Sequence, residues 1–357
     1  MEAGLIDPIS AEYALEQLRQ NWLDKLWCEL FNGEQGGLMS PGQIRREGRS
    51  RIEVRQMEMA AIIEAEEDIN RIHHGEKGID DRGNIIDTPP VDHIATHAII
   101  EQPTLNTDLD PSLSDTSSLL RSAVREIAVR DIERALNLRR LTILAESEIL
   151  GIAPCPVSSR PVNVQWLARW RELAQDVFNE EIQVIWARML VSEVAAPGSF
   201  SLDLMGRLAL LSANDIDMIQ LAAKYVLGDF IYDARRDYFN TDFHRQLFDE
   251  LGDLGLFTGE YRRREFASQH RERFRYLFTC HRKAILVEGV DQSARILLPV
   301  MVLSRVGRQL FRLTDTQADL AYLYKLGAAI KVQGFVVRAG DWQVVNGKGR
   351  FTSRLRL

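Results

Sequence analysis

Cysteine is scarce in this sequence, and no two cysteines lie close together. Cys28, Cys155 and Cys280 are odd in number and form no C-x-x-C pair, which argues against a disulfide framework or a zinc knuckle. No apolar run approaches the roughly 20 residues that a membrane helix needs. The N-terminus also lacks a basic region followed by an apolar stretch. We therefore expect a cytoplasmic protein in a reducing compartment, without a membrane partner.

Catalytic and cofactor motifs are also missing. The chain has no P-loop, no G-x-G-x-x-G between a strand and a helix, and no G-x-S-x-G. His93 and His97 have a spacing that suits metal ligands, but they lack the intervening glutamate of H-E-x-x-H. We expect a non-enzymatic protein with no cofactor and no metal, although a site assembled across the fold would leave no local motif.

The charge is unevenly distributed along the 357 residues. From Tyr261 to Leu357 there are 19 Lys or Arg and 7 Asp or Glu, a net charge of +12. The whole chain carries −7, so the first 260 residues carry −19. A hydrophobic content of 45% indicates a globular protein. The basic end is therefore expected either to dock on the acidic half or to bind an external polyanion.

Two helices are predicted in an N-terminal region, residues 1–74. The first runs from about Ser10 to Phe31, and the second from Ser40-Pro41 to about His74. The second has arginines in its first half and acids in its second half, which opposes the helix dipole. An antiparallel helical partner or self-pairing would explain this pattern, and a solvated helix with one apolar edge is the alternative. We predict an interaction helix that carries Arg45, Arg46, Arg49, Arg51 and Arg55.

A central helical domain, residues 119–228, is predicted after an acidic linker or surface excursion at residues 75–118, which is rich in glycine and proline. Within this domain, side chains that cap helix N-termini precede amphipathic runs. Acids in a first helical turn complement the helix dipole, so capping explains Glu180 and Glu181 better than catalysis does. We also expect Glu193 to have a structural role instead of a catalytic one, and Trp186 to be part of the hydrophobic core. The predicted caps are Asn163, Asn179, Ser199 or Ser201, and Ser212, the last with Asp215.

One stretch of the central domain resembles a known family. The run WLARWRELAQDVFNEEIQVIWARMLVSEVAAPGSFSLD, from Trp166 to Asp203, is similar to the core of an uncharacterised bacterial family, domain of unknown function 2806. S-P-G-Q-I-R-R-E-G-R and L-S-R-V-G-R-Q-L are similar to its N- and C-terminal regions. The family implies no activity. A related style of helix in abortive-infection proteins implies, by analogy, a role in bacterial phage defence.

The C-terminal region, residues 229–357, is predicted to be a small basic α+β domain similar to a winged helix. It combines a helix from Asp242 to Leu254, extended segments, and a closing hairpin around Ala339-Gly340-Asp341. Arginines interleaved with aromatic residues make this domain a candidate for binding nucleic acid or an acidic partner. The candidate residues are Arg262, Arg263, Arg264, Arg271, Arg273 and Arg275.

The sequence thus predicts a mainly α protein with helical N-terminal and central regions and a winged-helix-like C-terminal domain. Our leading hypothesis is an interaction protein that forms a homo-oligomer or binds a protein partner through its N-terminal helices, in bacterial anti-phage defence. The alternative is a winged-helix protein that binds nucleic acid through the C-terminal arginines.

Overall fold

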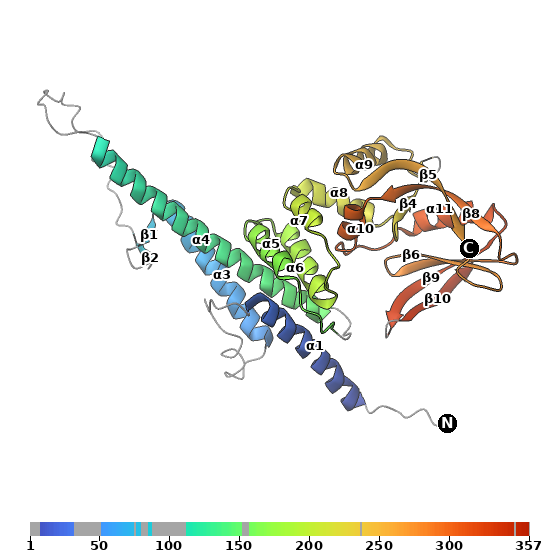
Figure 1. Cartoon of the computed structure of the whole chain (residues 1–357), viewed down its shortest axis with the longest axis horizontal. Helices are drawn as coiled ribbons and strands as arrows, with labels where there is room; N and C mark the ends of the chain where they lie inside the picture. The colour runs from blue at the N-terminus through green and yellow to red at the C-terminus, as the bar shows by residue number, and fades with distance from the viewer. Residues whose placement is uncertain are drawn as a thin grey trace, which may run out of the picture.

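The molecule is elongated, with a pair of long helices that projects from a body ending in β-sheets (Figure 1). This computed structural model describes residues 8–31, 51–74, 76–79, 85–87, 112–151, 157–235, 238–345 and 348–356. Within these ranges, no helix is both long and apolar enough to cross a bilayer. His93 and His97 lie outside the described residues.

The projecting pair consists of α3 (Arg51–His73) and the N-terminal part of α4 (Ser112–Gly151), and we call it the stalk. A helix of the 40 residues of α4 is about 60 Å long at 1.5 Å per residue. The two helices are antiparallel, and their contact is built around buried Ile69, Ile72 and Val129. A hairpin of β1 (Lys77–Ile79) and β2 (Ile85–Asp87) follows α3 within the stretch predicted as a linker.

Arginines of α4 face the acidic half of α3. Arg139 pairs with Glu58, and Arg140 lies 2.8 Å from Glu66. The pair with Glu66 offsets one of the acids that oppose the dipole of α3, and α4 supplies the antiparallel partner. The predicted interaction residues Arg45, Arg46 and Arg49 lie outside the described residues, and the side chains of Arg51 and Arg55 are not described. The interaction helix therefore stays a prediction.

Helix α1 (Pro8–Phe31) is part of the body. Trp22 and Leu26 are buried in the main core, so Trp22 is a packing residue. The ammonium group of Lys25 donates to the carbonyls of Ser158, Arg160 and Val194 at 2.7, 2.8 and 2.7 Å. Removal from water lowers the pKa of Lys25. This lysine therefore fastens α1 to the end of α6 and to the segment before α5.

Four central helices begin at the predicted capping residues. They are α5 (Val164–Ala174), α6 (Glu180–Ala195), α7 (Leu202–Leu208) and α8 (Ala213–Ala223). The side chains of Asn163, Asn179, Ser201 and Ser212 each accept a backbone N–H in the first turn, and Ser212 forms a capping box with Asp215. The predicted N-caps are confirmed, and of the two serines predicted for α7 it is Ser201 that caps the helix.

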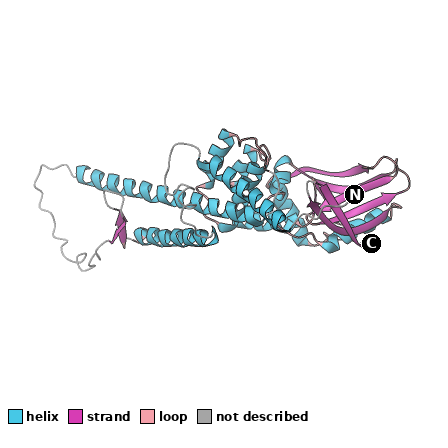
Figure 2. Cartoon of the chain, turned by 90° about the horizontal axis from the view of Figure 1, so that it is seen from below, coloured by secondary structure: helices cyan, strands magenta, loops and turns pink. Residues whose placement is uncertain are grey.

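The C-terminal region contains more strand than a winged helix, so the prediction of a mainly α fold with a winged-helix-like domain is wrong. Two antiparallel four-stranded sheets form there, with strand orders β3-β4-β8-β5 and β10-β9-β7-β6. Figure 2 shows the strands of these two sheets gathered at one end of the molecule, away from β1 and β2. The strands are β3 (Val226–Leu227), β4 (Phe230–Tyr232), β5 (Phe257–Ala267), β6 (Phe274–Cys280), β7 (Lys283–Gly289), β8 (Arg295–Leu303), β9 (Val336–Val345) and β10 (Lys348–Arg356).

The closing hairpin predicted around Ala339-Gly340-Asp341 is also wrong. These three residues lie in the middle of β9, which pairs with β7 on one side and with β10 on the other. Glycine by itself has a low propensity for strands. Pairing with β7 and β10 on both sides nevertheless keeps the chain extended through Gly340. The chain reverses after Val345 instead.

Three helices accompany the sheets: α9 (Asp242–Asp253), α10 (Arg305–Phe311) and α11 (Leu320–Lys331). α11 contacts strands of both sheets, and α10 contacts α7 and α8. A single cluster of buried apolar side chains consequently extends from Trp22 in α1 to Val337 in β9. The sheets are therefore held against the helical body.

Glu193, near the end of α6, is a buried carboxylate with a structural role. Its Oε1 accepts the N–H of Gly198 at 2.5 Å, and its Oε2 accepts the N–H of Phe200 at 3.0 Å. These two bonds shape the turn between α6 and α7. Glu180 and Glu181, in the first turn of α6, are exposed.

We expect Glu193→Ala to lower the free energy of unfolding by about 2–4 kcal/mol, because two N–H groups of the turn would lose their acceptor. Urea denaturation measures the change. Glu181→Ala is the matched control, with an expected loss of at most about 0.5 kcal/mol through the helix dipole. Equal losses in the two variants would contradict the structural role of Glu193.

Candidate functional site

The six predicted C-terminal arginines are divided between β5 of one sheet, β6 of the other, and the loop that joins these two strands. Arg263 and Arg264 lie on β5, and Arg262 lies there too, although its side chain is not described. Arg264 is half-buried, pairs with Asp229 at 2.9 Å, and lies over the rings of Phe230 and Phe266. We assign Arg264 to the structure of the sheet. The fold therefore does not gather all six arginines into one site.

The other three arginines lie in the loop before β6 and on β6, an edge strand of the second sheet. Arg271 and Arg273 are in the exposed loop of residues 268–273, and Arg275 is on the strand. Along β6, Phe274 and Phe278 point into the core. Because side chains alternate between the two faces of a strand, Arg275 and Leu277 lie on the opposite face. We call this face, which the four strands β10-β9-β7-β6 form, the open face.

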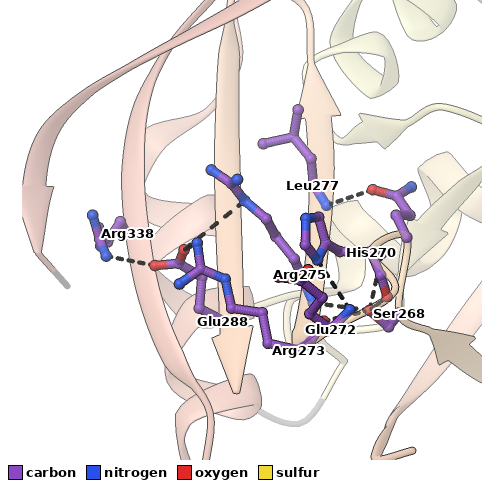
Figure 3. A network of polar contacts seen from close by, with 9 residues as sticks. Ser268, His270, Glu272, Arg273, Arg275, Leu277, Glu288 and Arg338 are labelled. Carbon is purple, nitrogen blue, oxygen red and sulfur yellow. Dashed lines mark hydrogen bonds and ion pairs between the residues drawn. The ribbon is translucent and has the colours of Figure 1, made fainter. Parts of the chain in front are cut away.

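Ser268 organises the loop of residues 268–273 (Figure 3). Its hydroxyl accepts the N–H groups of His270 and Arg275 at 3.1 Å each. The same hydroxyl lies 2.9 Å from the carbonyl oxygens of His270 and Arg273, and its one proton is within hydrogen-bond distance of both acceptors. The N–H of Leu277, on the edge strand β6, donates to Oε1 of Gln269 at 3.1 Å. The loop is thereby tied to the strand that carries Arg275.

Glu288 on β7 is the counter-ion of the open face. It lies 2.5 Å from Arg338 on β9, and 3.9 Å from both Arg273 and Arg275 (Figure 3). The Glu288 side chain is 14% exposed, whereas those of the three arginines are 44–56% exposed. One carboxylate therefore faces three guanidinium groups, which leaves this group, the Glu288 network, with a net positive charge at the surface.

An open pocket of about 370 Å³ adjoins this network on the same face. Arg275 belongs to both, so the charged and the apolar parts of the face are contiguous. A volume of this order lies within the range of pockets that hold small ligands. The pocket is lined by Gln269, His270, Arg275, Leu277, Leu286, Trp342, Gly349 and Phe351.

Two glycines make room for the aromatic side chains of the pocket. A Cβ on Gly349 would lie 1.9 Å from Cη2 of Trp342, and a Cβ on Gly340 would lie 2.8 Å from Cε2 of Phe351. Trp342 and Phe351 are themselves cross-strand partners in the pairing of β9 with β10. The two rings therefore lie across the strands, over backbone that carries no side chain.

Four of the residues that define this face were not predicted from the sequence: Glu288, Arg338, Trp342 and Phe351. One signal for the aromatic pair was present, because Asn346-Gly347 is a typical dipeptide of a tight hairpin. A hairpin at that dipeptide would place Trp342 opposite Phe351. No local signal shows that Glu288 meets Arg338, because the two are 50 residues apart.

Other ionisable groups of the body serve packing. The hydroxyl of Tyr238 donates to Asp319 at 2.8 Å. Burial raises the pKa of Tyr225 to about 12 and also raises the pKa of Tyr238. Both phenols therefore stay protonated at neutral pH. Throughout the described ranges, no three His, Cys, Asp or Glu residues are grouped so that they would hold a metal ion.

Comparison with known proteins gives one match. Residues 130–246 match the model of a family described as protein of unknown function (DUF2806). The matched stretch runs from α4 through α8 and the pair β3–β4 into α9, and it stops before the open face. Neither the curated proteins nor the solved structures match, so no similarity to abortive-infection proteins is found. The resemblance predicted from the sequence is confirmed over residues 130–246.

Proposed function

We propose that the protein binds nucleic acid through the open face of the β10-β9-β7-β6 sheet. The observation that supports this most directly is the adjacency of exposed arginines and surface aromatic rings on one face. Guanidinium groups contact phosphates, and aromatic rings contact bases. Arg275 joins the two parts, because it belongs to the Glu288 network and lines the pocket.

The charge distribution of the chain supports an external polyanion. Residues 261–357 carry a net charge of +12, and Glu288 is the carboxylate paired with the arginines of the open face. In the acidic half, Glu58 and Glu66 pair with Arg139 and Arg140 of α4. Glu58 and Glu66 are therefore matched by α4, and binding of the basic end to these two acids is the less favoured explanation.

A double variant tests this function. We expect Arg273→Ala/Arg275→Ala to weaken binding of a labelled 20-nucleotide strand at low salt by about tenfold or more, because two phosphate contacts are lost. The slope of log K against log salt should fall by about 1.4–1.8, at roughly 0.7–0.9 per contact. Fluorescence anisotropy over a salt series measures both quantities.

The control is Arg245→Ala, which removes an exposed arginine of α9 that pairs with Asp242. Its affinity and salt slope should equal those of the unmodified protein. If the unmodified protein binds neither DNA nor RNA at low salt, the proposed function is wrong. An equal loss of affinity in the control and in the double variant would show that the contacts are not on the open face.

Self-association through the stalk is a second candidate function. Met57 and Ile63 of α3 are 54% and 50% exposed, and Ile127 of α4 is 61% exposed. Large apolar side chains on projecting helices favour contact with another helix. This observation supports the expected homo-oligomer. A role in phage defence stays a prediction of the sequence analysis.

Sedimentation equilibrium tests self-association. We expect an oligomer at micromolar concentration, and we expect Met57→Lys/Ile63→Lys to shift it toward the monomer, because two charges would be buried in the contact. Leu210→Lys is the control, since Leu210 is exposed on the body, between α7 and α8. A monomer at all concentrations, or an unchanged oligomer in the double variant, would exclude assembly through this part of the stalk.

A further inference from the structure

We propose that Trp342 and Phe351 stack on unpaired bases, so that the ligand of the open face is a single-stranded nucleic acid. This inference rests on the proposed function and narrows it. A binding surface that used arginines alone would contact phosphates of single and double strands alike. Aromatic rings at a protein surface bind unpaired bases, because the bases of a single strand can unstack from one another and stack on the rings.

The arrangement of the rings supports stacking. Trp342 lies over Gly349 and Phe351 lies over Gly340, so each ring has the bare backbone of the neighbouring strand beneath it. Both side chains line the pocket and are partly exposed. One side of each ring is thus supported by the sheet, while the pocket gives access from the solvent. A base that enters the pocket meets a preformed surface, and little side-chain ordering is needed on binding.

The apolar floor between the aromatic pair and the loop is suited to a flat, weakly polar group. Leu277 on β6 and Leu286 on β7 are directly opposite each other in the pairing of these strands, and both line the pocket. Trp342 and Phe351 form the corresponding pair on β9 and β10. The pocket therefore crosses all four strands of the sheet. Such a floor accommodates bases better than phosphates, which would lose hydration there without gaining a partner.

Polar groups stand along the rim of this floor. Nδ1 of His270 accepts the N–H of Glu272 at 3.3 Å, which fixes the ring at the edge of the loop. Gln269 is held by its bond from Leu277. Both residues line the pocket beside Arg275, which continues into the Glu288 network. The phosphates are placed at Arg273 and Arg275, and the bases on the aromatic pair.

The test compares three labelled probes against the full chain at one salt concentration. They are a 12-nucleotide single strand, a strand of the same length with abasic sugars at its central positions, and a hairpin duplex. We expect the normal strand to bind at least roughly tenfold more tightly than the abasic strand, because stacking on each ring is lost with the bases. It should also bind more tightly than the duplex.

Trp342→Ala should remove about tenfold of the affinity for the normal strand, leave the abasic strand unchanged, and leave the salt slope unchanged. Trp342→Phe keeps a ring over Gly349. It is the second variant, in case Trp342→Ala does not fold. In that variant, the quenching of tryptophan fluorescence on binding should disappear while most of the affinity remains. Tyr324→Ala, which removes a 44% exposed aromatic residue of α11, is the matched control and should change nothing.

The two proposals fail in different ways. If the normal and abasic strands bind equally, if the duplex binds as tightly as the single strand, or if Trp342→Ala binds normally, stacking is overturned. The arginine double variant would still weaken binding in these cases, and the proposed function would stand. If no probe binds at low salt, the proposed function fails and the stacking inference fails with it.

Discussion

The C-terminal half of α4 packs along α6, and this contact joins the stalk to the rest of the molecule. Its polar part is Asn137 of α4, which donates to the carbonyl of Gln175 at 3.0 Å and lies 3.4 Å from the amide of Gln183. Gln183 also donates to the carbonyl of Val177 at 2.7 Å, so buried amides fix the register of the two helices. Arg188 of α6 then pairs with Glu148 of α4 at 3.0 Å and donates to the carbonyl of Leu313. The helical body and the sheet region thereby share one frame.

The contacts among α4, α6 and the sheet region determine where the open face lies. The sheet itself determines which side chains are exposed on that face. Burial of one face of the β10-β9-β7-β6 sheet turns Phe274 and Phe278 inward and leaves Arg275 and Leu277 outward. Glu288 is largely covered, and it holds Arg338 in place while the guanidinium groups stay accessible. Because one carboxylate faces three arginines, the face keeps a positive charge near an apolar pocket. That combination suits a polymer with both charged and flat aromatic parts.

Features that a few neighbouring residues determine could be predicted from the sequence, and features that depend on distant segments could not. A helix cap is decided within four residues, so Asn163, Asn179 and Ser212 were predicted correctly. Sheet pairing is decided by distant segments: β7 pairs with β9 about 50 residues later, and Gly340 consequently lies within a strand instead of a turn. Six arginines between Arg262 and Arg275 were predicted to form one binding site, whereas strand alternation turns Arg264 toward Phe266. Trp342 and Phe351 were missed because their meeting depends on the register of β9 and β10.

Ultraviolet cross-linking followed by mass spectrometry of the linked peptides measures most directly whether the open face is the binding surface. A uniformly labelled single strand is irradiated with the full chain at low salt, and the linked positions are mapped. We predict cross-links in the segments 268–277, 338–342 and 349–351, with Trp342 or Phe351 as the main site. Cross-links confined to the stalk helices or to α9, with none in these three segments, would contradict the account.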